Sequence, residues 1–374
     1  MIKYKREDLY NNYVQQQCEE ALAENSIDLP TYESIISQHP VRLYTPNVFI
    51  RIGLVLLTVL ILFFAFLLSG LAVQFESPSG LCFFISIACY AALEVLIGNS
   101  NHYNAGVDNA LSFCCVAFCF AGCTLLFKDY STVSLPNCFI AFLLCIYLAI
   151  RFTDAFMSVL AFLFLLTLAV SLFGHLSIAI LEPFVLMAVC AFVYFAVQKQ
   201  KTKFWLFPYF KSFSALSFIS ALCFYAAGNY YAISILSGYM NFHVMAKVEL
   251  PIGWFFWTWT MLMPLIYLAV GIIRKNALFL RMGLALVIVA LLTFRHYYSV
   301  MPAEIALILG GIISIIASYA LIRYLKRPRH GFTFDEAVRR SEGTALSHEL
   351  IKNTLMNKTT AHAQIHDNRD SADY

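Results

Sequence analysis

Long apolar runs fill most of the chain between residues 51 and 324. A helix that crosses the hydrocarbon core of a bilayer needs about 20 mainly apolar residues, and ten stretches approach or reach that length. They cover residues 52–74, 81–98, 109–127, 133–150, 154–173, 176–197, 212–235, 253–273, 277–294 and 303–323. The period-two alternation of a transmembrane β-barrel is missing from them, and backbone groups in lipid must be bonded within their own segment. We therefore predict an all-α, polytopic transmembrane helical bundle of about ten spans.

The composition supports a membrane protein. The chain has 374 residues, of which 60% are hydrophobic and 13% are charged, whereas soluble domains carry about 25% charged residues. This balance excludes a disordered protein, a small disulfide-stabilised secreted scaffold and a nucleic-acid-binding protein, which needs a strongly basic face. We expect the lipid bilayer to be the main partner, and no nucleic acid.

Lysine and arginine residues predict how the bundle is oriented, because they concentrate in short cytoplasmic loops. With the N-terminus inside, fourteen of these residues fall on the cytoplasmic side and three on the outside. The inner set is Arg42, Arg51, Arg151, Lys199, Lys201, Lys203, Lys211, Arg274, Lys275, Arg281, Arg323, Lys326, Arg327 and Arg329; the outer set is Lys128, Lys247 and Arg295. An even number of spans then places both termini in the cytoplasm. The compact loops favour a bacterial inner membrane.

Two very short connections bear on the number of spans. Only residues 151–154 separate the fourth and fifth runs, and only Gly174 and His175 separate the fifth and sixth. Each connection would make a very tight helical hairpin. If either pair of runs were one broken helix, the number of spans would fall to eight or nine.

Polar segments flank the predicted bundle. Residues 1–50 form a cytoplasmic prelude with one helix over Arg6–Glu24 and a second that begins near Pro30, a residue suited to a first helical turn, and ends at His39. Residues 51–324 form the bundle, and residues 325–374 form a polar tail that is partly disordered. These cytoplasmic ends could recruit protein partners.

Glu182 is the ionisable residue that most needs an explanation. It lies about six residues inside the sixth run, or roughly 9 Å deep at 1.5 Å per residue, where a charge costs at least ~2.5–3.5 kcal/mol. Pro183 follows it and is expected to kink the helix and free the carbonyl of Ala179. A carboxyl group beside a free carbonyl suits a cation or proton site. The alternative is a protonated or hydrogen-bonded structural acid.

A polar connection between the second and third runs holds three further candidates for an ion path. Glu94 precedes it, and His102 and Asp108 lie within it, among asparagine and glycine residues that are typical of turns. A solvated loop is the favoured interpretation. The alternative is a polar mouth or cation site, although the spacing matches no metal geometry. We predict no metal site and no cofactor.

Arg151 and Asp154 stand three residues apart at the short connection between the fourth and fifth runs. Opposite charges at this spacing pair readily. We predict a structural ion pair between them rather than a catalytic role.

Two classes of function remain. The first is a carrier or channel for a small solute or ion that uses Glu182 and Glu94. The second is a non-catalytic membrane scaffold or sensor that recruits partners through its cytoplasmic ends. An enzyme is less favoured, because the nucleotide-binding, serine-hydrolase and zinc-peptidase motifs are missing; an intramembrane enzyme acting on lipid would have to rely on His102 or Asp108.

Overall fold

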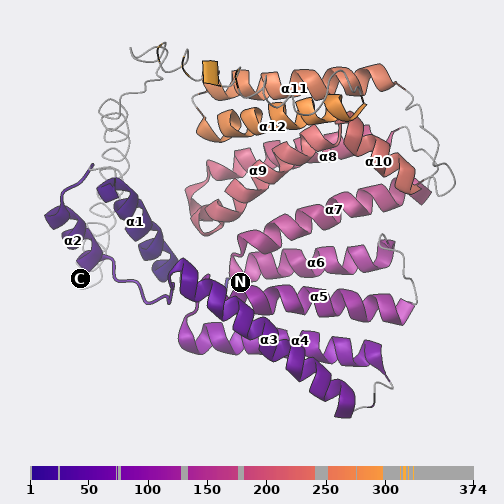
Figure 1. Cartoon of the computed structure of the whole chain (residues 1–374). Helices are drawn as coiled ribbons and strands as arrows, with labels where there is room; N and C mark the ends of the chain where they lie inside the picture. Colours follow the sequence, from indigo (N-terminus) through magenta and orange to yellow (C-terminus); the bar gives the residue numbers. More distant parts are fainter. Residues whose placement is uncertain are drawn as a thin grey trace, which may run out of the picture. The chain divides into compact units, whose positions relative to one another are not determined.

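The computed structural model describes residues 2–23, 26–72, 74, 77–127, 134–175, 181–240, 252–274 and 276–297, together with the isolated positions 312, 315, 316, 319 and 323. Within these residues all regular secondary-structure elements are helices (Figure 1), and β-structure is limited to one isolated bridge between Tyr44 and His102. The predicted all-α class is confirmed.

The helices follow one another with short connections. Their bounds are α1 Arg6–Ala23, α2 Leu29–Gln38, α3 Val48–Ala72, α4 Pro78–Ser100, α5 Val107–Phe127, α6 Leu135–Phe152, α7 Ala155–His175, α8 Glu182–Lys201, the 3-10 helix η1 Phe204–Tyr209, α9 Phe210–Ala226, α10 Tyr230–Met240, α11 Gly253–Ile273 and α12 Ala277–Tyr297.

Nine helical segments of the described chain are long and apolar enough to cross a membrane. They correspond to the first nine predicted runs, so the chain is a multi-pass membrane protein with a helical bundle. The tenth run, residues 303–323, lies outside the described residues except for five isolated positions.

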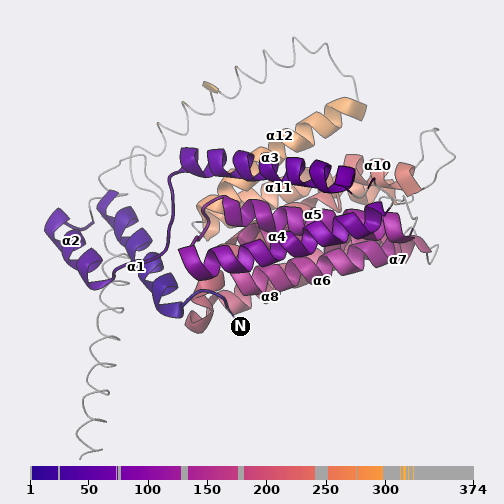
Figure 2. The same cartoon turned by 90° about the horizontal axis from the view of Figure 1, so that it is seen from below.

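The bundle is built from helical hairpins of neighbouring segments. The pairs α4–α5, α6–α7, α8–α9 and α11–α12 pack along their lengths, and α3 lies against α5 and α4 (Figure 2). Glycine allows the closest of these approaches: a Cβ atom on Gly271 of α11 would lie 2.6 Å from the backbone nitrogen of Leu280, and one on Gly283 of α12 would lie 2.8 Å from that of Leu268. Small residues at helix contacts are characteristic of packing in membranes.

Cysteine contributes to the same close packing. All eleven cysteines are free thiols, and nine of them are buried. Cys89, Cys138, Cys145 and Cys190 are at most 1% exposed. In these positions the thiol acts as a small apolar side chain between helices.

The short connection between the fourth and fifth runs is a true hairpin turn. Helix α6 ends at Phe152 and α7 begins at Ala155, with Thr153 in the left-handed region at φ 52°. The two helices then pack against each other. They are therefore separate spans and not one broken helix.

The seventh predicted span is wrong in its extent. Residues 212–235 do not form one helix, because α9 ends at Ala226 and α10 begins at Tyr230. The side chain of Asn229 accepts the backbone N–H groups of Tyr231 at 3.0 Å and Ala232 at 3.2 Å, which caps the start of α10. Gly228 leaves no room for a Cβ atom against the ring of Trp259.

The chain divides into two compact units. The described residues of Met1–Leu9 and Arg42–Tyr298 form the bundle unit, and those of Tyr10–Val41 belong to the other unit. Within the latter, α1 and α2 pack as a helix pair around Cys18, Ala21 and Ile27, which confirms the two predicted helices of the prelude. Side-chain hydrogen bonds join the beginning and the end of residues 10–41: the amide of Asn11 donates to the carbonyl of Pro40 at 2.9 Å, and that of Gln15 donates to the carbonyl of His39 at 2.8 Å.

Candidate functional site

The first residues of the chain cross one end of the bundle. We call residues 2–6 the N-terminal strap and this end of the bundle the strap end. The backbone N–H of Lys3 donates to the carbonyl of Arg151 at 3.0 Å, and the hydroxyl of Tyr4 donates to the carbonyl of His102 at 3.0 Å. The guanidinium of Arg6 donates to the carbonyl of Trp205 at 3.1 Å. The strap therefore contacts the α4–α5 connection, the end of α6 and the helix η1.

Glu94 holds the strap electrostatically. Its two carboxylate oxygens lie 2.8 Å from Lys3 Nζ and 2.6 Å from Arg151 Nε. The hydroxyl of Tyr90 donates to the same carboxylate at 2.9 Å, and Tyr147 is 2.7 Å from that hydroxyl. With two cations and a hydroxyl around it, Glu94 is a compensated acid that joins α4, α6 and the strap.

This geometry corrects the expected ion pair between Arg151 and Asp154. Arg151 points toward Glu94 on α4, whereas the carboxylate of Asp154 accepts the backbone N–H of Phe156 at 2.8 Å. Asp154 thus caps the start of α7, where an acid is favoured by the unpaired N–H groups and the helix dipole.

The polar connection between α4 and α5 is bonded to the chain on two sides and is not a simple solvated loop. Tyr44, which precedes α3, donates its N–H to the carbonyl of Asn101 and accepts the N–H of Tyr103, at 3.0 and 3.2 Å. Its ring meets that of His102 edge-on at 5.0 Å. The hydroxyl of Tyr4 also bonds this connection. The chain segments on the two sides of residues 10–41, which contain Tyr4 and Tyr44, are therefore both bonded to the α4–α5 connection.

His102 has one unusual atom. Its Nδ1 is buried and has no hydrogen-bond partner among the described residues. The carbonyl of the same residue accepts the bond from Tyr4. The strap is therefore bonded to the backbone carbonyl of His102 and not to its ring nitrogen.

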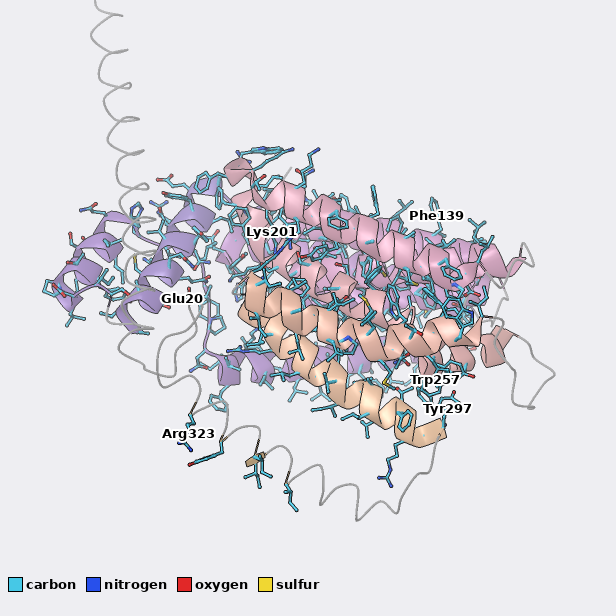
Figure 3. The ribbon with its side chains drawn as sticks, turned by 90° about the horizontal axis from the view of Figure 1, so that it is seen from above. Glu20, Phe139, Lys201, Trp257, Tyr297 and Arg323 are labelled. Atoms are coloured by element: carbon cyan, nitrogen blue, oxygen red, sulfur yellow. The ribbon has the colours of Figure 1, made fainter. Side chains whose placement is uncertain are left out.

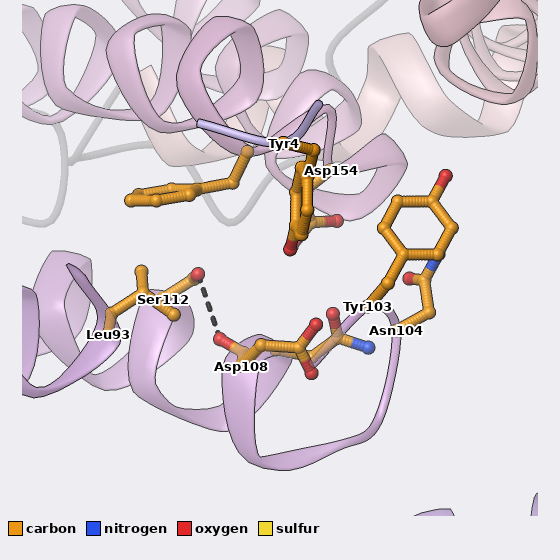
Figure 4. Close-up of a pocket in the computed structure, with 9 residues that line it drawn as sticks. Tyr4, Leu93, Tyr103, Asn104, Asp108, Ser112 and Asp154 are labelled. Atoms are coloured by element: carbon orange, nitrogen blue, oxygen red, sulfur yellow. Dashed lines mark hydrogen bonds between the residues drawn. The ribbon is translucent and has the colours of Figure 1, made fainter. Parts of the chain in front are cut away.

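Asp108 and Asp154 line one small cavity beneath the strap (Figure 4). They are 6% and 8% exposed, and the other polar residues of the lining are Tyr4, Tyr103, Asn104, Asn109 and Ser112. The cavity measures about 10 Å³, which is room for about one water molecule. A carboxyl group of α5 and one from the turn between α6 and α7 thus line the same small cavity.

The acids in this cavity interact with each other. Burial raises the pKa of the Asp154 carboxyl above its ordinary value, the charge of Asp108 raises it further, and the cation of Arg51 lowers it. Burial also raises the pKa of the Tyr4 and Tyr103 hydroxyls. Asp108 itself accepts the N–H of Gly106 at 2.9 Å. The backbone N–H groups of Phe156 and Met157, which bond the Asp154 carboxyl, lower its pKa and offset part of this rise.

Glu182 lies elsewhere, at the end of the bundle opposite the strap. It is the first residue of α8, and Pro183 follows in the first turn, where its missing N–H leaves no bond unmade. The expected depth within a helix and the expected kink are therefore wrong. Glu182 is nevertheless only 4% exposed, and its Oε1 has no hydrogen-bond partner among the described residues.

Comparison with protein-family models, with curated proteins and with solved structures gives no match. The site must therefore be interpreted from its own geometry. In the described part of the chain, no three His, Cys, Asp or Glu side chains come together in a way that could hold a metal ion.

The four residues proposed for an ion path occupy four different surroundings. Glu94 is neutralised by Lys3 and Arg151, His102 is held by Tyr4 and Tyr44, and Asp108 shares a cavity with Asp154. Glu182 is at the other end of the bundle. Their roles in transport stay predictions.

The strap has no recognisable signal in the sequence. Lys3 and Tyr4 stand in a polar N-terminal segment without apolar periodicity, and their partners are about 90 to 150 residues away. Tyr44 gave no signal either, since a single β-bridge has no repeating pattern. The Gly228-Asn229 pair was visible, because this dipeptide is a common turn signal, and it could have divided the seventh run.

Proposed function

We propose that the protein is a non-catalytic membrane scaffold or sensor that presents the helix pair α1–α2 to a basic partner protein in the cytoplasm. The observation that carries this proposal is the double attachment of residues 10–41. The strap enters them and Tyr44 follows them, and both bond the α4–α5 connection. A change at this end of the bundle would therefore act on both chain segments that lead to the helix pair.

The charge of the helix pair indicates the chemistry of the partner. Residues 10–41 contain five acidic residues, Glu19, Glu20, Glu24, Asp28 and Glu33, and no lysine or arginine. Four of them, all but Glu24, are exposed side chains of the described structure. Charge complementarity governs partner choice and association rate, so a basic protein segment is the favoured ligand.

The distribution of cations supports a cytoplasmic location for this face. The strap end carries lysines and arginines on the strap itself and on the ends of α6, α8 and α11, whereas Arg295 lies at the opposite end. Such an excess is typical of cytoplasmic ends. The inner leaflet is also anionic and would repel an acidic helix pair, which keeps its surface available to a protein.

Site-specific photo-crosslinking tests the proposal. A photoreactive amino acid replaces Ser34, an exposed residue of α2, in cells that carry the intact gene. We expect one predominant crosslinked protein, joined through a lysine- or arginine-rich segment. Neutralising the acidic surface with Glu19→Gln, Glu20→Gln, Asp28→Asn and Glu33→Gln should remove this product.

Matched variants make the result specific. Thr31→Ala and Gln38→Ala change exposed neutral side chains of the same helix and should leave the crosslink intact. A photoreactive residue at Phe192, an exposed position of α8, should give no such product. A crosslink that survives neutralisation of the acidic surface, or no protein crosslink at all from position 34, would contradict the proposal.

A carrier for protons or small cations is the second candidate, and Glu182 favours it. A buried carboxylate with an unpaired oxygen is unusual, and an acid in a membrane span is a functional candidate by default. Ion flux into proteoliposomes tests this function: a carrier that uses Glu182 would lose flux in Glu182→Gln. Equal flux in both proteins, or none in either, would leave the scaffold as the supported function.

A further inference from the structure

We propose that the bundle holds one anionic phospholipid, with an acyl chain in an apolar cavity between α8, α9, α11 and α12 and with its phosphate at Lys201 and Arg274. This inference concerns a different part of the bundle from the α4–α5 connection and does not depend on the proposed function.

The cavity has the size and chemistry of a hydrocarbon site. It measures about 170 Å³, and apolar cavities of about 150 Å³ can take a six-carbon molecule such as benzene. Its lining is almost wholly apolar and consists of Cys190, Ala191, Tyr194, Phe195, Ser220, Ala221, Phe224, Tyr267 and Phe279.

The cavity borders the lipid-facing surface. Phe195, which forms part of the lining, is 70% exposed, and Phe192 one turn away is 74% exposed. Two hydroxyls of the lining are bonded within the protein: that of Tyr267 donates to the carbonyl of Ala221 at 2.8 Å, and that of Ser220 donates to the carbonyl of Ser217 at 3.3 Å. An acyl chain is therefore the molecule that can both reach this cavity from the bilayer and fill it.

Two cations stand in line with the cavity at the strap end. Lys201 follows Tyr194 by seven residues on α8, and Arg274 follows Tyr267 by seven residues at the end of α11. A spacing of seven residues places the tyrosine and the cation of each pair on one helix face, about 10.5 Å apart along the axis. The rings of Tyr194 and Tyr267 both contact the ring of Phe279, with centroid distances of 6.0 and 5.6 Å. The faces of α8 and α11 that carry Lys201 and Arg274 therefore meet at the same side of the cavity. Lys201 is labelled in Figure 3.

No acid of the described chain neutralises these cations. The ion pairs found there all use Glu94, with Lys3 and Arg151 as its partners. Lys201 is half-buried and Arg274 is exposed. Cations at span ends are common. A basic site between spans above an apolar cavity is the combination that binds anionic lipid head groups.

Native mass spectrometry of the purified protein tests the proposal. The full chain is titrated with phosphatidylglycerol or with phosphatidylcholine of the same acyl length. We expect one tightly held phosphatidylglycerol, with affinity falling about fivefold for each cation removed in Lys201→Gln and Arg274→Gln. Ala191→Phe, and the smaller change Ala191→Leu, should reduce retention of the lipid by filling the cavity.

Control variants lie on the same bundle. Arg295→Gln removes a cation at the opposite end of α12, and Ala285→Phe adds the same bulk on an exposed face of that helix; both should keep the lipid. Glycerol phosphate in excess should not displace it, since the acyl chain supplies the cavity contact. Equal retention of the two lipids, displacement by glycerol phosphate, or unchanged retention in both Ala191 variants would overturn the proposal.

Discussion

Glu94 and Arg151 form an ion pair that joins α4 to α6, with 2.6 Å between Glu94 Oε1 and Arg151 Nε. The other oxygen of Glu94 accepts Lys3 of the strap at 2.8 Å. Because the carbonyl of Arg151 also accepts the backbone N–H of Lys3, these three residues fix the N-terminus to the bundle. Glu94, first proposed as a member of an ion path, is thus explained by the attachment of the strap.

Glu94→Gln should loosen the strap. The substitution leaves Lys3 and Arg151 without their counterion, and the loss of a charge-assisted bond costs about 1–3 kcal/mol. The lower part of this range applies because the side chains are 19% and 29% exposed. We expect a lower apparent Tm in detergent and faster hydrogen–deuterium exchange in residues 2–6.

Glu7→Gln is the matched control, since Glu7 is an exposed acid in the first turn of α1. It should change stability by less than about 0.5 kcal/mol. If the two variants behave alike, or if exchange in the strap is unchanged in Glu94→Gln, the ion pairs of Glu94 do not hold the strap.

Asp154→Asn should remove a pH dependence of stability. Burial and the charge of Asp108 raise the pKa of Asp154, while Arg51 lowers it in part. The folded protein therefore binds the proton more tightly than the unfolded chain does, and stability falls as pH rises from the ordinary pKa of an aspartate through the raised one. Asparagine resembles the protonated acid and keeps the cap of α7.

Thermal unfolding across this pH range measures the effect. Asp154→Asn should show a flatter profile than the unmodified protein and equal or higher stability at neutral pH. Asp108→Asn should narrow the pH range over which stability falls, because it removes the negative charge that raises the pKa of Asp154. The same pH profile in Asp154→Asn and the unmodified protein would show that Asp154 does not titrate in this way.

Gly228→Ala should disturb the break between α9 and α10. A Cβ atom at this position would overlap the ring of Trp259, and overpacking of this kind costs about 1–3 kcal/mol. Gly53→Ala is the control, since nothing lies within 4 Å of its added Cβ. Apparent Tm and tryptophan fluorescence should change in Gly228→Ala only; a stable Gly228→Ala protein with unchanged fluorescence would exclude this packing.

The apolar pattern was sufficient for the spans, because lipid imposes a length and a composition on every helix that crosses it. Arg151 to Asp154 was correctly read as a hairpin turn. The seventh run failed because Tyr230 and its neighbours are as apolar as a span, while Asn229 ends one helix and caps the next. The hydropathy of a segment does not reveal a helix cap within it.

The candidate site was harder to predict, because its contacts join distant parts of the chain. Arg151 has Asp154 three residues away, yet it pairs with Glu94 on another helix. Local spacing could not reveal this, nor that Tyr4 reaches the carbonyl of His102. Glu182 was correctly identified as a residue that needs explanation, but the start of α8 had to be known before its depth could be judged.

Genetic complementation compares the two functions most directly. A strain that lacks the gene receives either the variant with Glu19, Glu20, Asp28 and Glu33 neutralised or Glu182→Gln, each checked for normal membrane insertion. A scaffold that acts through its acidic helix pair predicts that the neutralised variant fails to restore the phenotype and that Glu182→Gln restores it. Restoration by the neutralised variant together with failure of Glu182→Gln would contradict the scaffold and support a carrier.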